Sequence, residues 1–221
     1  MAKTPSKMLS SFLLCASALG CTQLMNIENA SCDPEVADCP NEQSALGPSP
    51  LCTEYCDTVM RACPVESGSA VYSGVELCLA VCKYLPPGAP GDRFKNSVEC
   101  RLEQARAVER TNGEDLSGCP GAGPGGEGTP DAGGAVCNSA CENFCDLYMQ
   151  ECTDSDKYRV FASKQECLDD CATVPDLGGY STQIAEGNTL QCRLWHLTAA
   201  ADQAWPHCNH AAGLNTCVDE Q

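Results

Sequence analysis

Apolar residues are distributed unevenly along the chain. Residues 8–19 form an apolar run of 12 residues that follows two lysines, which is typical of a secretory leader and is too short to span a bilayer. Other stretches hold few large apolar side chains, and one of them is dominated by Gly and Pro. The pattern predicts a signal peptide at 1–20, a disordered tether at 21–50, a first module at 51–119, a flexible Gly/Pro linker at 120–136 and a second module at 137–221.

The two modules are repeats of one another. Five cysteines of the first recur in the second at a constant offset of 89 residues, and the side chains between them agree as well, for example Met60 with Met149 and Leu79 with Leu168. The matched cysteines are Cys52, Cys56, Cys63, Cys78 and Cys82 with Cys141, Cys145, Cys152, Cys167 and Cys171.

The cysteine spacing predicts helices. Cysteines at i, i+4 and i+11 lie on one face of a helix, and the segment 76–85 mixes Glu with Leu, Ala and Val, which favours helix. A CxxxC pair facing a CxxxC pair resembles the helical hairpin in which two antiparallel helices are joined by two disulfide rungs. We therefore expect an all-α, small disulfide-rich protein, with two tandem stapled three-helix modules after the tether.

Antiparallel geometry predicts the rungs, and a third helix near residues 94–110 and 188–203 would be fixed by one more bridge in each module. Eight cysteines allow about 105 pairings, so other connectivities remain open, and Cys137 could belong to either module. The expected pairs are Cys32–Cys39, Cys52–Cys82, Cys56–Cys78, Cys63–Cys100, Cys119–Cys137, Cys141–Cys171, Cys145–Cys167, Cys152–Cys192 and Cys208–Cys217.

Composition narrows the class of protein. Twenty cysteines in 221 residues indicate an oxidising compartment outside the cytoplasm. A formal charge of −17 argues against nucleic acid as a partner, since a phosphate backbone needs a basic surface. The sequence lacks C-x-x-C, G-x-S-x-G, a P-loop and H-E-x-x-H, so we expect no enzyme.

The end of the leader carries a further signal. Ala18-Leu19-Gly20-Cys21 resembles the bacterial lipobox, which implies cleavage before Cys21 and a lipid on its sulfur. Loss of Cys15 with the leader and acylation of Cys21 leave 18 of the 20 cysteines, an even number. By the same resemblance, Thr22 favours the outer membrane or cell surface. The alternative is an ordinary secretory signal with a cysteine near its cleavage site.

All three histidines lie near the end of the second module, in Cys192-Arg193-Leu194-Trp195-His196 and His207-Cys208-Asn209-His210. This pattern resembles a cysteine-rich repeat of exported proteins of myxobacterial type; the resemblance covers residues 50–220 and implies no activity. The first module has Gln104, Gly118 and Gly121 at the corresponding positions.

Imidazole is a good ligand for Zn and Cu, so His196, His207 and His210 are candidate metal ligands, with water or a carboxylate completing the site. In the alternative interpretation, His196 packs beside Trp195 while the other two bind backbone around a Cys208–Cys217 loop.

Two functions follow from these features. The first is a lipid-anchored cell-envelope protein of binding or structural type that meets an envelope or extracellular protein partner, without a cofactor. The second is a metal-binding (Cu or Zn) or redox-carrying envelope protein that uses the histidines of the second module.

Overall fold

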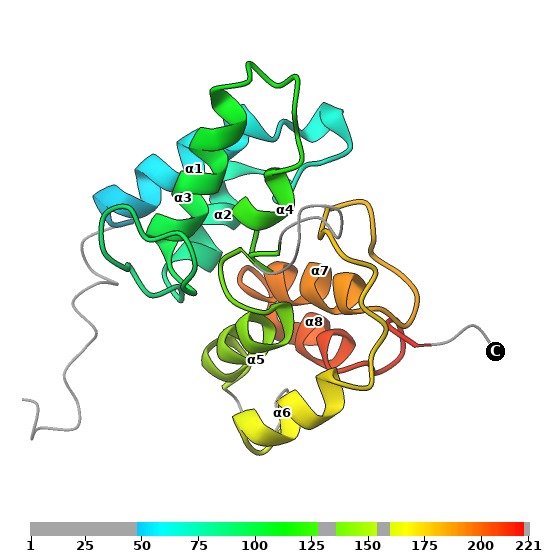
Figure 1. Ribbon diagram of the computed structural model, residues 1–221. Helices are drawn as coiled ribbons and strands as arrows, with labels where there is room; N and C mark the ends of the chain where they lie inside the picture. Colours follow the sequence, from blue (N-terminus) through cyan, green and yellow to red (C-terminus); the bar gives the residue numbers. More distant parts are fainter. Residues whose placement is uncertain (1–47, 128–135, 154–159, 219–221) are drawn as a thin grey trace, which may run out of the picture. The chain divides into compact units, whose positions relative to one another are not determined.

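The computed structural model describes residues 48–127, 136–153 and 160–218, in which all the regular elements are helices and no strand occurs (Figure 1). The first repeat contains α1 (Pro50–Ala62), a short 3-10 turn η3 (Val65–Ser67), α2 (Val75–Cys82), α3 (Val98–Glu109) and α4 (Cys119–Ala122). The second contains α5 (Ala140–Glu151), α6 (Lys164–Cys171), α7 (Leu190–Ala200) and α8 (Ala204–Ala211). The expected all-α, disulfide-rich class is confirmed, with a fourth helix in each repeat that the cysteine pattern did not predict. The expected signal peptide, most of the tether, Cys21 and the Cys32–Cys39 pair lie outside the described residues.

Most of these helices begin at a hydroxyl side chain. Ser49, Ser97, Ser139, Ser163 and Thr189 each accept a hydrogen bond from the backbone N–H three residues further on. A hydroxyl at this position satisfies one of the N–H groups that have no partner inside the helix. Because the same cap starts α1 and α5, and α3 and α7, the two repeats use the same local device.

The antiparallel rungs are present in both repeats. Disulfides join Cys52 to Cys82 and Cys56 to Cys78, and, in the second repeat, Cys141 to Cys171 and Cys145 to Cys167. Each rung closes a loop of 22 or 30 residues. Loop closure of this size is worth about 3 kcal/mol of stability per bridge in the chain-entropy description.

Of the five other predicted bridges, Cys32–Cys39 lies outside the described residues and the remaining four are wrong. The structure pairs Cys63 with Cys119 and Cys152 with Cys208, not with Cys100 and Cys192. It pairs Cys100 with Cys137 and Cys192 with Cys217, which replaces the expected Cys119–Cys137 and Cys208–Cys217 bridges.

The direction of the third helix explains the difference. In the first repeat Arg61, at the end of α1, forms an ion pair with Glu109 at the end of α3. The two helices therefore end on the same side, while Cys100 lies at the beginning of α3. Nine residues of helix separate Cys100 from Glu109, about 13 Å, which puts the sulfur of Cys63 beyond its reach. Cys119, which follows α3 in the chain, meets Cys63 instead.

The expected linker 120–136 is also corrected. Gly121, Ala122 and Glu127 are buried, and the carbonyls of Gly123 and Pro124 accept hydrogen bonds from the buried guanidinium of Arg101. The first repeat therefore continues past residue 119, at least to Glu127, and its last bridge uses Cys137.

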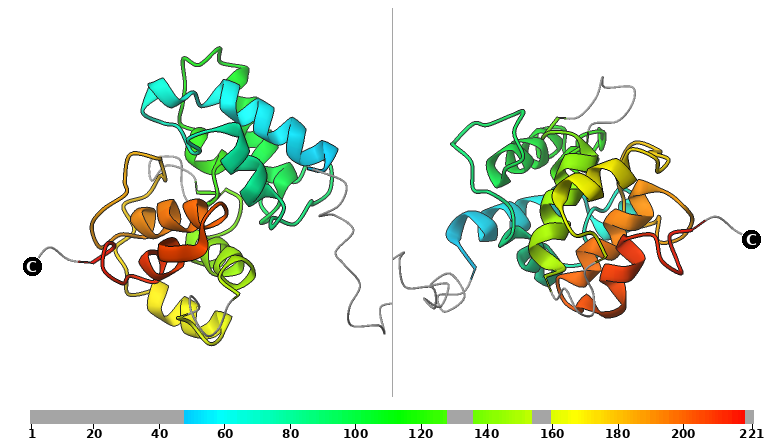
Figure 2. Two further views of the ribbon diagram at one scale, coloured as in Figure 1. Left: turned by 180° about the vertical axis from the view of Figure 1, so that it is seen from behind. Right: turned by 90° about the horizontal axis from the view of Figure 1, so that it is seen from below.

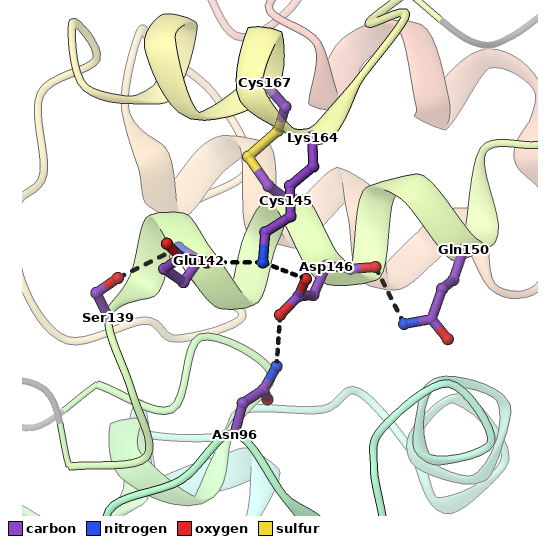
Figure 3. A network of polar contacts seen from close by, with 8 residues as sticks. All are labelled: Asn96, Ser139, Glu142, Cys145, Asp146, Gln150, Lys164 and Cys167. Atoms are coloured by element: carbon purple, nitrogen blue, oxygen red, sulfur yellow. Dashed lines mark hydrogen bonds and ion pairs between the residues drawn. A yellow bond between two sulfur atoms is a disulfide. The ribbon is translucent and has the colours of Figure 1, made fainter.

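Polar contacts connect the two repeats. Lys164 of α6 forms ion pairs with Glu142 and Asp146 of α5, at 2.7 and 2.6 Å, beside the Cys145–Cys167 bridge, and Asn96 of the first repeat donates to Asp146 at 3.2 Å (Figure 3). Elsewhere the Thr182 N–H donates to the carbonyl of Ala70. None of the helices in the described ranges is long and apolar enough to cross a membrane.

Candidate metal centre

The three histidines of the chain lie together at the contact between α7 and α8, which run side by side in every view (Figures 1 and 2). His196 comes from α7, and His207 and His210 come from one face of α8 at i and i+3. One nitrogen of each imidazole lies within 4.8 Å of the corresponding nitrogens of the other two. We call these three residues the histidine cluster.

Disulfides hold both helices of the histidine cluster in place. Cys192, one helical turn before His196, is joined to Cys217, and Cys208, between the two histidines of α8, is joined to Cys152 at the end of α5. Cys192 and Cys217 also lie near His196, but their sulfurs are consumed by the bridge. The cluster therefore offers only nitrogen ligands.

The rings pack closely against one another. The centroids of His196 and His207 are 5.2 Å apart and nearly stacked, while His210 meets His196 edge-on at 4.6 Å. The Nδ1 atoms of His196 and His207 are 2.9 Å apart and form a hydrogen bond, in which one ring donates its N–H to the other. Two imidazole nitrogens bound to one tetrahedral Zn²⁺ lie about 3.3 Å apart, so this pair has nearly that spacing, and an ion bound to both atoms would replace the hydrogen bond between them.

The surroundings of the histidine cluster keep the imidazoles neutral. Burial, then the neighbouring His210 and His207, lowers the pKa of His196 to about 4, although the backbone of Ala185 opposes the change. Burial, followed by His210, lowers the pKa of His207, and burial lowers the pKa of His210. Because a metal binds the neutral form of imidazole, all three side chains are ready to act as ligands at neutral pH.

In the alternative interpretation the histidines have packing and backbone hydrogen-bonding roles, and the structure agrees with only one part of it. His196 does pack edge-on against Trp195, with ring centroids 4.8 Å apart. The Nδ1 of His210, however, is buried without a hydrogen-bond partner in the described part of the chain, and that of His207 faces His196 instead of the backbone. The Cys208–Cys217 loop that the alternative required does not form.

The first repeat brings the equivalent positions together without the ligands. A Cβ atom on Gly121 would lie 3.2 Å from the side chain of Gln104, and a Cβ atom on Gly118 would lie 3.3 Å from the backbone carbonyl oxygen of Gln104. The scaffold that gathers three side chains is thus common to both repeats, and imidazoles occupy it only in the second.

Comparison of the chain with models of protein families, with curated proteins and with solved structures found no match.

Proposed function

We propose that the second repeat binds one transition-metal ion, Zn²⁺ or Cu²⁺, through His196, His207 and His210. The observation that carries this proposal is the convergence of three imidazoles within 4.8 Å, from two helices that are each fixed by a disulfide. Imidazole is a preferred ligand of both metals. Hard cations such as Ca²⁺ are disfavoured because the cluster supplies no oxygen ligand.

Three protein ligands leave a coordination position for water or another small ligand, as in zinc sites that are not purely structural. The fold does not need the ion for its stability, because eight disulfides tie the described residues together. We infer that the ion is bound and released by a preformed protein, which is typical of capture or transport and unlike a zinc finger.

Metal titration tests the proposal on the whole mature chain. We expect one Zn²⁺ or Cu²⁺ per chain in competition with a chromophoric chelator, and a loss of affinity of at least about 100-fold in His196→Ala/His207→Ala, because one remaining imidazole cannot hold the ion. Cu²⁺ bound there should also quench Trp195, whose ring is 4.8 Å from that of His196. Gln104→Ala, at the equivalent position of the first repeat, is the matched control. Equal, weak binding by the parent and the double variant would remove the metal site.

The pH dependence of metal binding gives a second readout. Protons and the metal ion compete for the same imidazole nitrogens. Because the pKa of each imidazole is lowered, this competition becomes strong only below the ordinary pKa of histidine, 6.5. We therefore expect the affinity for Zn²⁺ to change by less than about threefold between pH 8 and pH 6.5. A tenfold fall over this interval would show that the imidazoles have ordinary pKa values.

We also propose that the protein acts at the bacterial outer membrane or cell surface, anchored by lipid on Cys21. The support is the sequence Ala18-Leu19-Gly20-Cys21 after a basic and apolar leader. Cys21→Ser should abolish labelling by a fatty-acid analogue and release the protein from the membrane fraction. Cys15→Ser, within the leader, should leave both unchanged, and labelling that persists in Cys21→Ser would refute the anchor.

A further inference from the structure

A cavity of about 420 Å³ lies where the two repeats meet, beside the histidine cluster. The first repeat contributes α2 to the lining, with Glu76 and Leu77. The second repeat contributes α7, α8 and the turn between them, with Trp195, His207 and Asp202. The volume is in the range of cavities that hold small organic molecules. Neither repeat forms this cavity alone.

Two acidic side chains, both exposed to solvent, give the lining of the cavity a negative charge. Glu76 and Asp202 both line it, one from each repeat, while no Lys or Arg does. In the described part of the chain neither carboxylate takes part in an ion pair or a side-chain hydrogen bond. Two like charges that face one cavity, without a cation between them, favour a positively charged occupant.

The rest of the lining combines apolar and aromatic side chains with the polar side chains of Ser73, Thr182, Thr198 and Gln203. The indole of Trp195 is half-buried and lines the cavity together with Leu77, Ala80 and Ala199. The hydroxyl of Tyr180 is already hydrogen-bonded to the hydroxyl of Thr198, at 3.2 Å, and therefore needs no hydrogen bond from a bound ligand. An aromatic ring near carboxylates is the chemistry that recognises organic ammonium groups, through cation–π attraction and burial of the carbon atoms that the cation carries.

We propose that this cavity is a binding site for a small organic cation, an alkyl- or arylammonium compound. The apolar body of the ligand lies against Trp195 and Leu77, and its ammonium group lies between the carboxylates of Glu76 and Asp202. A bare metal ion would leave the apolar wall without a contact, and a carboxylate ligand would be repelled by both acids. This site needs no metal ion, because none of the three imidazoles binds the ammonium group. His207 lines the cavity and is also a proposed metal ligand, so the test uses the metal-free chain.

The test uses the metal-free mature chain carrying Trp205→Phe, so that Trp195 is the only tryptophan. Benzylammonium and benzyltrimethylammonium should change the fluorescence of Trp195 with saturation, and calorimetry should give one site per chain. Benzyl alcohol and benzoate, which have similar shapes without the positive charge, should bind at least about tenfold more weakly. Absence of saturable binding by both cations, or equal binding of benzyl alcohol, would overturn the proposal.

A pair of double variants separates a specific site from general attraction to an acidic protein. Glu76→Gln/Asp202→Asn should weaken binding of benzylammonium by at least about tenfold. Glu66→Gln/Glu114→Gln removes the same charge from exposed positions away from the cavity, and should change the affinity by less than about twofold. Equal losses in the two double variants would mean that only the overall charge of the protein attracts the cation.

Discussion

Replacement of Arg101 by methionine is expected to lower the free energy of unfolding by at least about 3 kcal/mol. The guanidinium is fully buried and donates to the carbonyls of Gly123, Pro124 and Ser97, at 2.9, 2.9 and 3.1 Å. Methionine fills a similar volume but leaves the Pro124 carbonyl without a donor and removes the charged donor from the Gly123 and Ser97 carbonyls, which keep only the backbone N–H groups of Gly126 and residue 101. Hydrogen bonds from a charged donor are worth about 1.5–3 kcal/mol each. Arg101→Lys should recover only part of the loss, because an ammonium group cannot reproduce the planar fork.

Urea denaturation with the disulfides intact measures this effect. Arg61→Met is the control, since Arg61 is exposed and its ion pair with Glu109 is worth less than about 1 kcal/mol. If the two variants unfold at the same urea concentration, Arg101 does not hold the 123–124 segment, and the packed end of the first repeat would need another explanation.

Replacement of Glu151 by glutamine is expected to stabilise the protein at neutral and alkaline pH. Glu151 is buried, and its two carboxyl oxygens have no hydrogen-bond partner in the described part of the chain. Burial raises its pKa from the ordinary 4.5 to about 9, although Lys83 opposes the rise. The folded protein therefore keeps a proton that the unfolded chain releases between these values, and the free energy of unfolding falls as the pH rises through this window.

Glutamine does not ionise, so the free energy of unfolding of the variant should exceed that of the parent by nothing near pH 4 and by about 3 kcal/mol near pH 7. Thermal unfolding of parent and variant across this range measures the difference. Glu66→Gln, at an exposed position, should leave the pH dependence as it is. A difference between Glu151→Gln and the parent that stays constant with pH would show that Glu151 is already ionised in the folded protein.

Helical spacing predicts contacts within a hairpin well and contacts beyond it poorly. The rungs from Cys52 and Cys56 follow from two antiparallel helices alone, because the i and i+4 spacing places both sulfurs on one face. The partners of Cys63 and Cys100 depend on the direction in which α3 packs against α1, and nothing in the local pattern determines that direction. The same limit explains why all four errors occur at equivalent positions of the two repeats.

The prediction of a flexible linker after residue 119, which rests on composition, is also wrong for the end of the first repeat. Gly and Pro between residues 120 and 127 are typical of a flexible linker. In the folded protein the absence of side chains instead allows close approach, and a Cβ atom on Gly123 would lie 2.9 Å from Val71. The long-range partner that makes this packing possible, Arg101, carries no sign of that role in the sequence.

The histidine cluster could be predicted from the sequence, whereas the cavity could not. Three histidines confined to one repeat, near matched cysteines, indicate a common site because the cysteines tie their helices together. Glu76 and Asp202 are single acids in a chain with 30 acidic residues, and they line one cavity only because the two repeats pack against each other. No local pattern distinguishes them from solvated surface charge.

X-ray absorption at the metal edge of the loaded, unreduced mature chain tests the central claim most directly. Three imidazoles predict a first shell of nitrogen at about 2.0 Å, with the outer-shell scattering of histidine rings and no sulfur at about 2.3 Å. The same spectrum from His196→Ala/His207→Ala should lose the imidazole scattering. A sulfur shell, or a first shell of oxygen alone in the parent protein, would contradict a metal centre built from His196, His207 and His210.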